Sequence, residues 1–150
     1  MAGKHDPEKL RGKLFAYAKQ VAFFDMIDLE VEDFGPGWSR CTIRPGEDLR
    51  NSNGAIHGGV IASLIDAGAF EALLMTEEYQ TIVREQGGSL STLDLRVRYL
   101  RPLTGDVATC QSKITRLGKR IVHASGVVNN SAGKEIAFGD TIMMFVRAGD

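Results

Sequence analysis

One acidic residue stands alone in a long apolar stretch of the sequence. Asp66 is the only charged side chain between Arg50 and Glu71, and its neighbours are small or aliphatic. An unpaired carboxylate taken out of water costs several kcal/mol, so stability alone would favour Leu or Ala there. Asp66 is therefore a candidate base or nucleophile whose reactivity is raised by desolvation. The structural alternative is a buried Asp that Ser63 or a backbone group satisfies, or one on a wet face of its helix.

The segment before this stretch, residues 51–59, reads Asn-Ser-Asn-Gly-Ala-Ile-His-Gly-Gly. Glycines at a helix start let a carbonyl oxygen approach the free backbone N–H groups closely, and the helix dipole adds to the attraction. Such donors form oxyanion sites, and loss of one typically lowers a rate by ~10²–10³. Small residues are also common at helix starts for packing reasons, so the pattern is weak by itself.

Gly58 and Asp66 would lie eight residues apart on one helix. At 1.5 Å per residue their separation is ~12 Å, too far for both to act on one carbonyl group. If both act, the reacting group must lie between two antiparallel helices of a two-fold dimer, with Gly58 from one subunit and Asp66 from the other. The spacing thus predicts a homodimer with two composite sites.

The elements that must position these residues follow from periodicity. Apolar residues at helical spacing predict an amphipathic N-terminal helix over about residues 7–24, and residues 58–75 are apolar on every side, which is typical of a buried helix. Alternating patterns predict strands within residues 29–43, around a Gly35-Pro36-Gly37 turn, and at about 92–99, 106–117, 120–129 and 134–147.

A buried helix followed by strands joined through short turns favours a curved antiparallel sheet wrapped around that helix, because only enclosure buries all its sides. The prediction is an α+β hotdog fold: five to six strands, a long central helix and an extra N-terminal helix. No repeat or linker divides the chain, so we expect one domain over residues 1–150.

Composition narrows the classes of function. The 19 acidic and 18 basic residues nearly cancel, which disfavours nucleic acid as a partner. Cys41 and Cys110 are expected to be buried free thiols, and His5, His57 and His123 share no metal-ligand spacing, so no metal is expected. The chain shows no secretory signal and no apolar run of membrane-spanning length, which favours a cytoplasmic protein without a membrane partner.

These residues together resemble a known family. Asn51, His57-Gly58-Gly59 and Asp66, followed by Thr92-x-Asp94-x-x-x-x-Tyr99-Leu100-Arg101-Pro102, are similar to the phenylacetate-pathway (PaaI-type) hotdog acyl-CoA thioesterases. The likeness runs from about residue 26 to residue 146. It implies an acyl-CoA substrate, with CoA as part of the substrate and no separate cofactor, and a homodimer that pairs into a dimer of dimers.

The resemblance also implies roles at matching positions. Asp66 matches the catalytic carboxylate, as nucleophile or general base, and Gly58 the backbone donor that polarises the thioester carbonyl. Asn51 and His57 match residues that position the thioester or water. Thr92 matches a Ser or Thr that orients the attacking water. Because it alternates with Leu93 and Leu95, a β-bulge or a dimer groove must bring Thr92 to the site.

Binding of the substrate is expected from further residues. Gly59 belongs to the same helix start. The turn that contains Gly118, Lys119 and Arg120 resembles a basic hairpin that holds CoA phosphates in relatives, and Arg101 is expected to assist. Two other functions stay open at this point: a hotdog acyl-CoA hydratase or dehydratase, and a non-catalytic acyl-CoA binding protein. The sequence does not indicate which acyl group is preferred.

Overall fold

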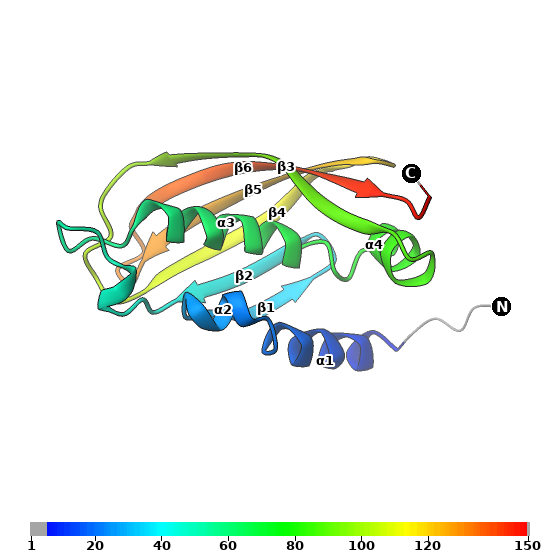
Figure 1. Cartoon of the computed structure of the whole chain (residues 1–150), viewed down its shortest axis with the longest axis horizontal. Helices are drawn as coiled ribbons and strands as arrows, with labels where there is room; N and C mark the ends of the chain where they lie inside the picture. The colour runs from blue at the N-terminus through cyan, green and yellow to red at the C-terminus, as the bar shows by residue number, and fades with distance from the viewer. Residues whose placement is uncertain (1–5, 150) are drawn as a thin grey trace.

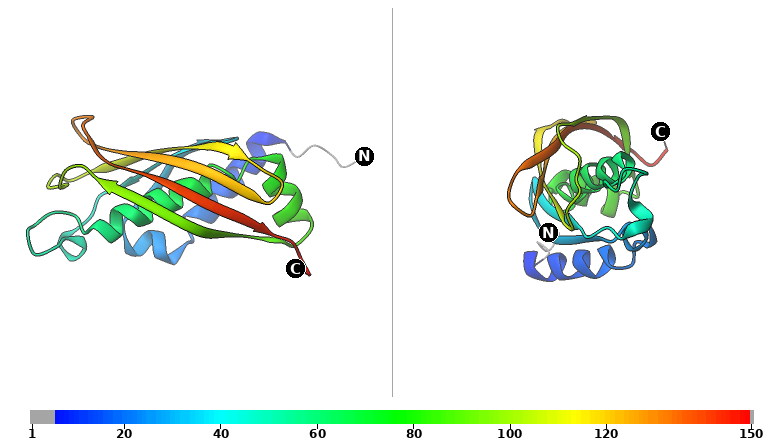
Figure 2. Two further views of the ribbon diagram at one scale, coloured as in Figure 1. Left: turned by 90° about the horizontal axis from the view of Figure 1, so that it is seen from above. Right: turned by 90° about the vertical axis from the view of Figure 1, so that its left-hand side faces the viewer.

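A computed structural model of the protein describes residues 6–149. Six antiparallel strands form one curved sheet in the order β1-β2-β4-β5-β6-β3, and helix α3 (Gly58–Glu71) lies along its concave side (Figure 1; Figure 2). The predicted α+β hotdog architecture is confirmed. The strands are β1 (Leu29–Gly35), β2 (Trp38–Ile43), β3 (Ser89–Tyr99), β4 (Ala108–Leu117), β5 (Ile121–Asn130) and β6 (Glu135–Val146).

The N-terminal region contains two helices where one was predicted. Helix α1 (Pro7–Ala18) is capped by Asp6 at its start and by Lys19 at its end. Helix α2 (Ala22–Met26) starts after Val21, whose backbone is extended. The extended residue breaks the helical repeat and sets α2 at a new angle before β1. Three short segments were not predicted: η1 (Glu47–Leu49), α4 (Glu77–Tyr79) and the π-helical η2 (Gln80–Glu85).

Close packing against the sheet fixes the rotation of α3. A Cβ atom at Gly68 would lie 2.4 Å from Ser112 Oγ, so glycine lets α3 approach β4 this closely while Ser112 keeps its position. The Ser39 hydroxyl of β2 donates to the Gly68 carbonyl at 2.6 Å. On β5 and β6, Gly126 and Gly139 leave room for Ile65, because a Cβ at either position would contact its side chain at 3.2–3.4 Å. One face of α3 is therefore held against the sheet.

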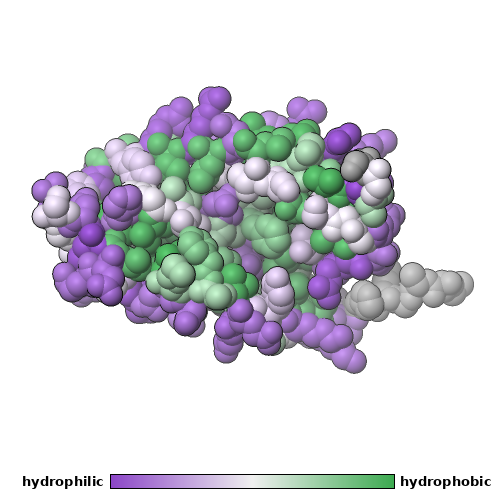
Figure 3. Space-filling view, in the orientation of Figure 1, coloured by the Kyte–Doolittle hydropathy of each residue, from purple (hydrophilic) through white to green (hydrophobic). Residues whose placement is uncertain are grey.

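The opposite face of α3 remains uncovered. Leu64, Ile65 and Ala69 are buried, whereas a stripe at helical spacing is half-buried or exposed and comprises Gly59, Ala62, Ser63, Asp66 and Phe70. The expectation that α3 is enclosed on every side is thus wrong for a single chain, because the sheet wraps round only part of the helix. Figure 3 views this side of the molecule, where apolar surface gathers over the middle of the face and hydrophilic residues line its margin.

Strand β3 forms one edge of the sheet and pairs only with β6. The register shifts between Thr92 and Asp94, so Leu93 is an extra residue that forms a β-bulge. The bulge changes which residues point toward α3. Thr92 pairs with the inward-facing Met143 and therefore lies on the concave side, as the sequence required of it.

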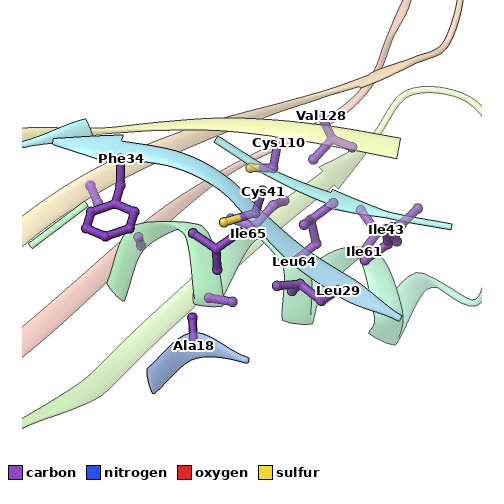
Figure 4. Close-up of a cluster of buried hydrophobic side chains, with 14 of the residues drawn as sticks. Ala18, Leu29, Phe34, Cys41, Ile43, Ile61, Leu64, Ile65, Cys110 and Val128 are labelled. Carbon is purple, nitrogen blue, oxygen red and sulfur yellow. The ribbon is translucent and has the colours of Figure 1, made fainter. Parts of the chain in front are cut away.

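The core between α3 and the sheet is apolar and also receives the N-terminal helix (Figure 4). Cys41 and Cys110 lie opposite each other on β2 and β4, fully buried and not joined by a disulfide, which confirms the predicted free thiols. Burial raises the pKa of both thiols, so both are poor nucleophiles. Within residues 6–149, no helix has both the length and the apolar character needed to cross a membrane.

Among the residues that the structure describes, Glu71 is the only acidic or basic side chain buried in the core. It ends α3, is 2% exposed, and its Oε2 atom has no hydrogen-bond partner. Burial raises the pKa of its carboxyl group from 4.5 to about 7. The sequence pattern used Glu71 only as the next charged residue after Asp66 and did not predict its burial.

Glu71 predicts a pH-dependent stability. A carboxyl group whose folded pKa is raised stabilises the fold fully below its unfolded pKa of 4.5, and that contribution is lost as the pH rises through about 7. Glu71→Gln stays neutral at every pH. We therefore expect the melting temperature of Glu71→Gln minus that of the native chain to increase by on the order of 5 °C between about pH 5 and about pH 8.5.

The matched control is Glu85→Gln, since Glu85 is an exposed acid. Thermal unfolding of all three proteins at both pH values checks the prediction. An equal difference between Glu71→Gln and the native chain at the two pH values would contradict it.

Candidate active site

The start of α3 presents one free backbone donor. His57 caps the helix: its Nδ1 atom accepts the Gly59 N–H at 3.0 Å, and its carbonyl accepts the Val60 N–H at 2.9 Å. The Gly58 N–H makes no hydrogen bond within residues 6–149. Because Nδ1 of a neutral His57 is an acceptor here, its proton is on Nε2, which can donate to a ligand. Gly58 rather than Gly59 therefore supplies the free amide at the positive end of the helix dipole.

The Asn51 side chain organises the turn that precedes α3. Its Oδ1 atom accepts the N–H groups of Asn53 at 2.9 Å and Ala55 at 3.2 Å. The backbone of Asn51 closes the same turn, since its N–H donates to the Ala55 carbonyl at 2.7 Å. With Oδ1 engaged, the Nδ2 amide is the part of Asn51 that can donate to a ligand.

Gly58 and Asn51 line one depression, whose lining does not include His57. A cavity of about 300 Å³ brings Gly58 together with Asn51 and Arg101, two other predicted site residues, and with Tyr99. The Arg101 guanidinium donates to the Glu135 carbonyl of β6, which holds its side chain beside this cavity. The remaining lining is mainly apolar and consists of Ala55, Ile56, Ile61, Leu100, Pro102 and Leu103.

Arg50 fixes this region and was not singled out from the sequence. Its guanidinium donates to the carbonyl groups of Gly54 (3.0 Å), Thr104 (3.4 Å) and Gly105 (3.2 Å), and its side chain is only 12% exposed. It thereby ties the Asn51 turn to the loop that follows β3. The sequence signal was slight: one Arg directly before a polar turn.

Asp66 lies in the middle of the open stripe of α3, with Thr92 as its partner. The Thr92 hydroxyl donates to Asp66 Oδ1 at 2.9 Å, across the contact between α3 and β3. Asp66 is half-buried rather than buried, because the stripe that carries it is uncovered in a single chain. Oδ2 of Asp66 makes no hydrogen bond within the described part of the chain, so it can act on water or on a substrate.

The candidate residues therefore form two separate groups. Asn51, His57 and Gly58 meet at the first turn of α3, whereas Asp66 and Thr92 meet two turns later. Because α3 is one continuous helix of 14 residues, the estimate of ~12 Å between Gly58 and Asp66 holds. No single chain brings both groups to one small reacting atom.

The basic hairpin lies at the other end of α3. Gly118, Lys119 and Arg120 connect β4 to β5. Gly37 links β4 to the C-terminal end of α3, because its carbonyl accepts the Ile114 N–H of β4 and its own N–H donates to the Ala72 carbonyl. Lys119 lines a different cavity, together with Glu77, Glu78, Thr81, Ile82, Gln86 and Arg147. Within one chain, antiparallel pairing places this turn at the far end of the helix from Gly58, so the substrate-binding role of these three residues stays a prediction.

Metal-binding residues do not gather anywhere in the described chain. No group of three or more His, Cys, Asp or Glu side chains among residues 6–149 is placed to hold an ion. His5, which the sequence analysis considered, lies outside the described residues.

Comparison with known proteins identifies the family. The profile named Thioesterase superfamily matches residues 53–137, more than half of the chain, including Gly58, Asp66 and Thr92. The chain belongs to the thioesterase superfamily. The chain is 30% identical over 131 residues to the medium/long-chain acyl-CoA thioesterase YigI of Salmonella typhimurium. The aligned residues make up 81% of this chain and 83% of that protein.

One further relative and one solved structure are also similar to this chain. A Saccharolobus solfataricus protein named as an esterase is 30% identical over 105 residues, which make up 69% of this chain and 64% of that protein. A mutant form of the phenylacetic acid degradation protein PaaI of Thermus thermophilus superposes with a TM-score of 0.69 over 82% of this chain and 97% of that one. At 22% identity this last likeness shows the fold, and the PaaI-type assignment stays a prediction.

Arg50 gives a prediction about the stability of the site. Arg50→Ala removes three hydrogen bonds from a guanidinium group and leaves their carbonyl acceptors without that donor. We expect the free energy of unfolding to fall by on the order of 2 kcal/mol, measured by chemical denaturation.

Arg44→Ala is the matched control, since the Arg44–Glu30 pair spans 3.4 Å between well-exposed side chains. Its loss should change the free energy of unfolding by less than about 0.5 kcal/mol. Equal destabilisation by the two variants would show that Arg50 does not hold the Asn51 turn in place.

Proposed function

We propose that the protein hydrolyses acyl-CoA thioesters at sites shared between two subunits of a homodimer. The observation that carries the proposal is the separation of two complementary groups on the open side of α3. One group, at Gly58, can bind a carbonyl oxygen; the other, at Asp66, can activate water or attack the carbonyl carbon. The group at Gly58 has no carboxylate to activate water, and the group at Asp66 has no backbone amide to bind the carbonyl oxygen.

The chemistry of the proposed step needs only these groups. Asp66, oriented by the Thr92 hydroxyl, takes a proton from water that attacks the thioester carbon, or attacks that carbon itself. The Gly58 N–H stabilises the negative charge that develops on the carbonyl oxygen, with Asn51 Nδ2 and His57 Nε2 as further donors. The C–S bond breaks and the sulfur leaves as a thiolate. Where water attacks, the protonated Asp66 returns its proton to the thiolate, and the products are the free acid and CoA. Where Asp66 attacks, CoA leaves first with a proton from water, and a water molecule then hydrolyses the acyl–Asp66 anhydride to release the free acid.

Strand β3 supports the proposed dimer. It is 11 residues long, it forms an edge of the sheet, and its outer side is unpaired in the chain described here. An exposed strand of this length can pair with the same strand of a second copy. Leu93, Tyr99 and Leu100 are each about half exposed near this edge and would gain cover. Such pairing brings the open stripes of the two α3 helices to face each other.

A two-fold arrangement also gives the basic hairpin a role. When two α3 helices lie antiparallel, the C-terminal end of one lies beside the N-terminal end of the other. Lys119 and Arg120 would then approach Gly58 of the second subunit, where they could bind CoA phosphates. The substrate-binding role predicted for Gly118, Lys119 and Arg120 is therefore proposed across the subunit interface, and pairing of dimers into tetramers remains a prediction.

The acyl group of the substrate is proposed to be apolar. The lining around Gly58 is mainly aliphatic, and the relative from Salmonella typhimurium is named as acting on medium and long acyl chains. A panel of acyl-CoA esters of increasing chain length, with an arylacetyl-CoA included, would define the preference through release of free thiol.

The central test is Asp66→Asn. If Asp66 attacks the thioester carbon or activates the water that does so, the variant should lose at least about 10²-fold in kcat. It should still bind a non-hydrolysable thioether analogue of the substrate. Thiol release and analogue binding are measured on the same preparations. Asp106→Asn, which changes an exposed loop acid, is the control and should keep full activity.

Two results would overturn the proposal. Turnover of Asp66→Asn within about twofold of the native protein would exclude the carboxylate mechanism. Consumption of an enoyl-CoA without release of thiol by the native protein would indicate a hydratase instead of a hydrolase.

A further inference from the structure

Tyr99 contacts the proposed oxyanion site and has no role assigned so far. It is the last residue of β3, pairs with Ala137 of β6, and lies on the concave side of the sheet. Its hydroxyl group donates to the Gly58 carbonyl at 2.7 Å, although its side chain is 51% exposed. A half-exposed tyrosine is thus fixed in one orientation by a bond to the residue that carries the free amide.

The Tyr99 ring also packs directly against Gly58. A Cβ atom at position 58 would lie 3.2 Å from Tyr99 Cζ and 3.3 Å from its hydroxyl oxygen, which is tighter than ordinary contact. The ring therefore occupies the side of Gly58 from which a side chain would project. Both residues line the 300 Å³ cavity, so the contact sets where its wall and the Gly58 N–H lie relative to each other.

Tyr99 ties β3 to α3, as Thr92 does earlier in the same strand. Thr92 bonds to Asp66 and Tyr99 bonds to Gly58, so one strand holds both residues on which the proposed reaction depends. The Tyr99 hydroxyl already donates to a carbonyl group, and this excludes it as the donor to the departing sulfur in the same arrangement. Desolvation raises the pKa of the Tyr99 phenol, so the hydroxyl remains protonated and able to donate.

We propose that Tyr99 is a positioning residue: its hydroxyl and ring hold the first turn of α3 so that the Gly58 amide meets the thioester oxygen. The inference rests on the proposed function. Because the oxyanion develops only as the reaction proceeds, a displaced amide weakens binding of the transition state more than binding of the substrate.

Tyr99→Phe tests this role, since it removes the hydroxyl and keeps the ring. Loss of one such hydrogen bond should lower kcat about five- to tenfold, with KM within about twofold of the native value. The melting temperature should stay within a few degrees, because the side chain is half exposed. Tyr17→Phe, at an exposed tyrosine of α1, is the control and should leave kcat, KM and melting temperature unchanged.

The measurements distinguish failure of the Tyr99 role from failure of the proposed function. If Tyr99→Phe keeps the native kcat while Asp66→Asn is inactive, the positioning role is wrong and the proposed function stands. A raised KM with native kcat would also overturn it, since Tyr99 would then be a substrate contact. If the native protein releases no thiol from any acyl-CoA, the proposed function and the role of Tyr99 fall together.

Discussion

The packing of α3 against the sheet is the constraint on which the rest of the structure depends. Gly68 lets the helix approach β2 and β4, and Gly126 and Gly139 receive Ile65. These contacts hold one face of α3 against the sheet. Asp66 and the adjoining positions of the stripe then lie on the open side of α3, where a single chain covers them only in part.

That uncovered stripe explains how an isolated carboxylate can be tolerated in an apolar helix. In one chain Asp66 is half-buried, accepts a hydrogen bond from Thr92 and avoids the full cost of desolvation. Glu71 shows the contrast: it is sealed in the core, and burial raises the pKa of its carboxyl group to about 7. A second subunit over the stripe would shield Asp66 from water only when the complete site forms.

Much of this arrangement follows from residue patterns. Period-two and helical spacing predict the six strands and α3, because each pattern reports which side of its element is buried. The requirement for either a bulge or a dimer groove at Thr92 could also be deduced, since strict alternation places Thr92 on the wrong face, and the structure shows the bulge. The break between α1 and α2 could not, because residues 7–24 keep helical spacing through Val21, whose extended backbone depends on tertiary packing.

Other features depend on contacts between distant segments, which a single sequence does not encode visibly. Arg50 reaches the carbonyl groups of Thr104 and Gly105, and Tyr99 reaches Gly58, over more than 40 positions in each case. Neither partner can be inferred from local pattern. The same holds for the basic hairpin, whose residue types suit phosphate binding but whose place at the far end of α3 follows from the topology of the sheet.

Subunit complementation tests the composite site most directly. Gly58→Pro removes the amide N–H at the first position of a helix, where proline is favoured, and the extended backbone of His57 (ψ 134°) suits the residue before a proline. Gly58→Ala adds a Cβ atom and keeps the N–H, so it controls for the contact with Tyr99.

A heterodimer of one Asp66→Asn subunit and one Gly58→Pro subunit, isolated through two affinity tags, has one intact site of two if each site takes Gly58 from one chain and Asp66 from the other. Its thiol release should be about half that of the native dimer, while each parent homodimer is nearly inactive. A heterodimer no more active than its parents would place both groups of each site in one chain and contradict the shared site.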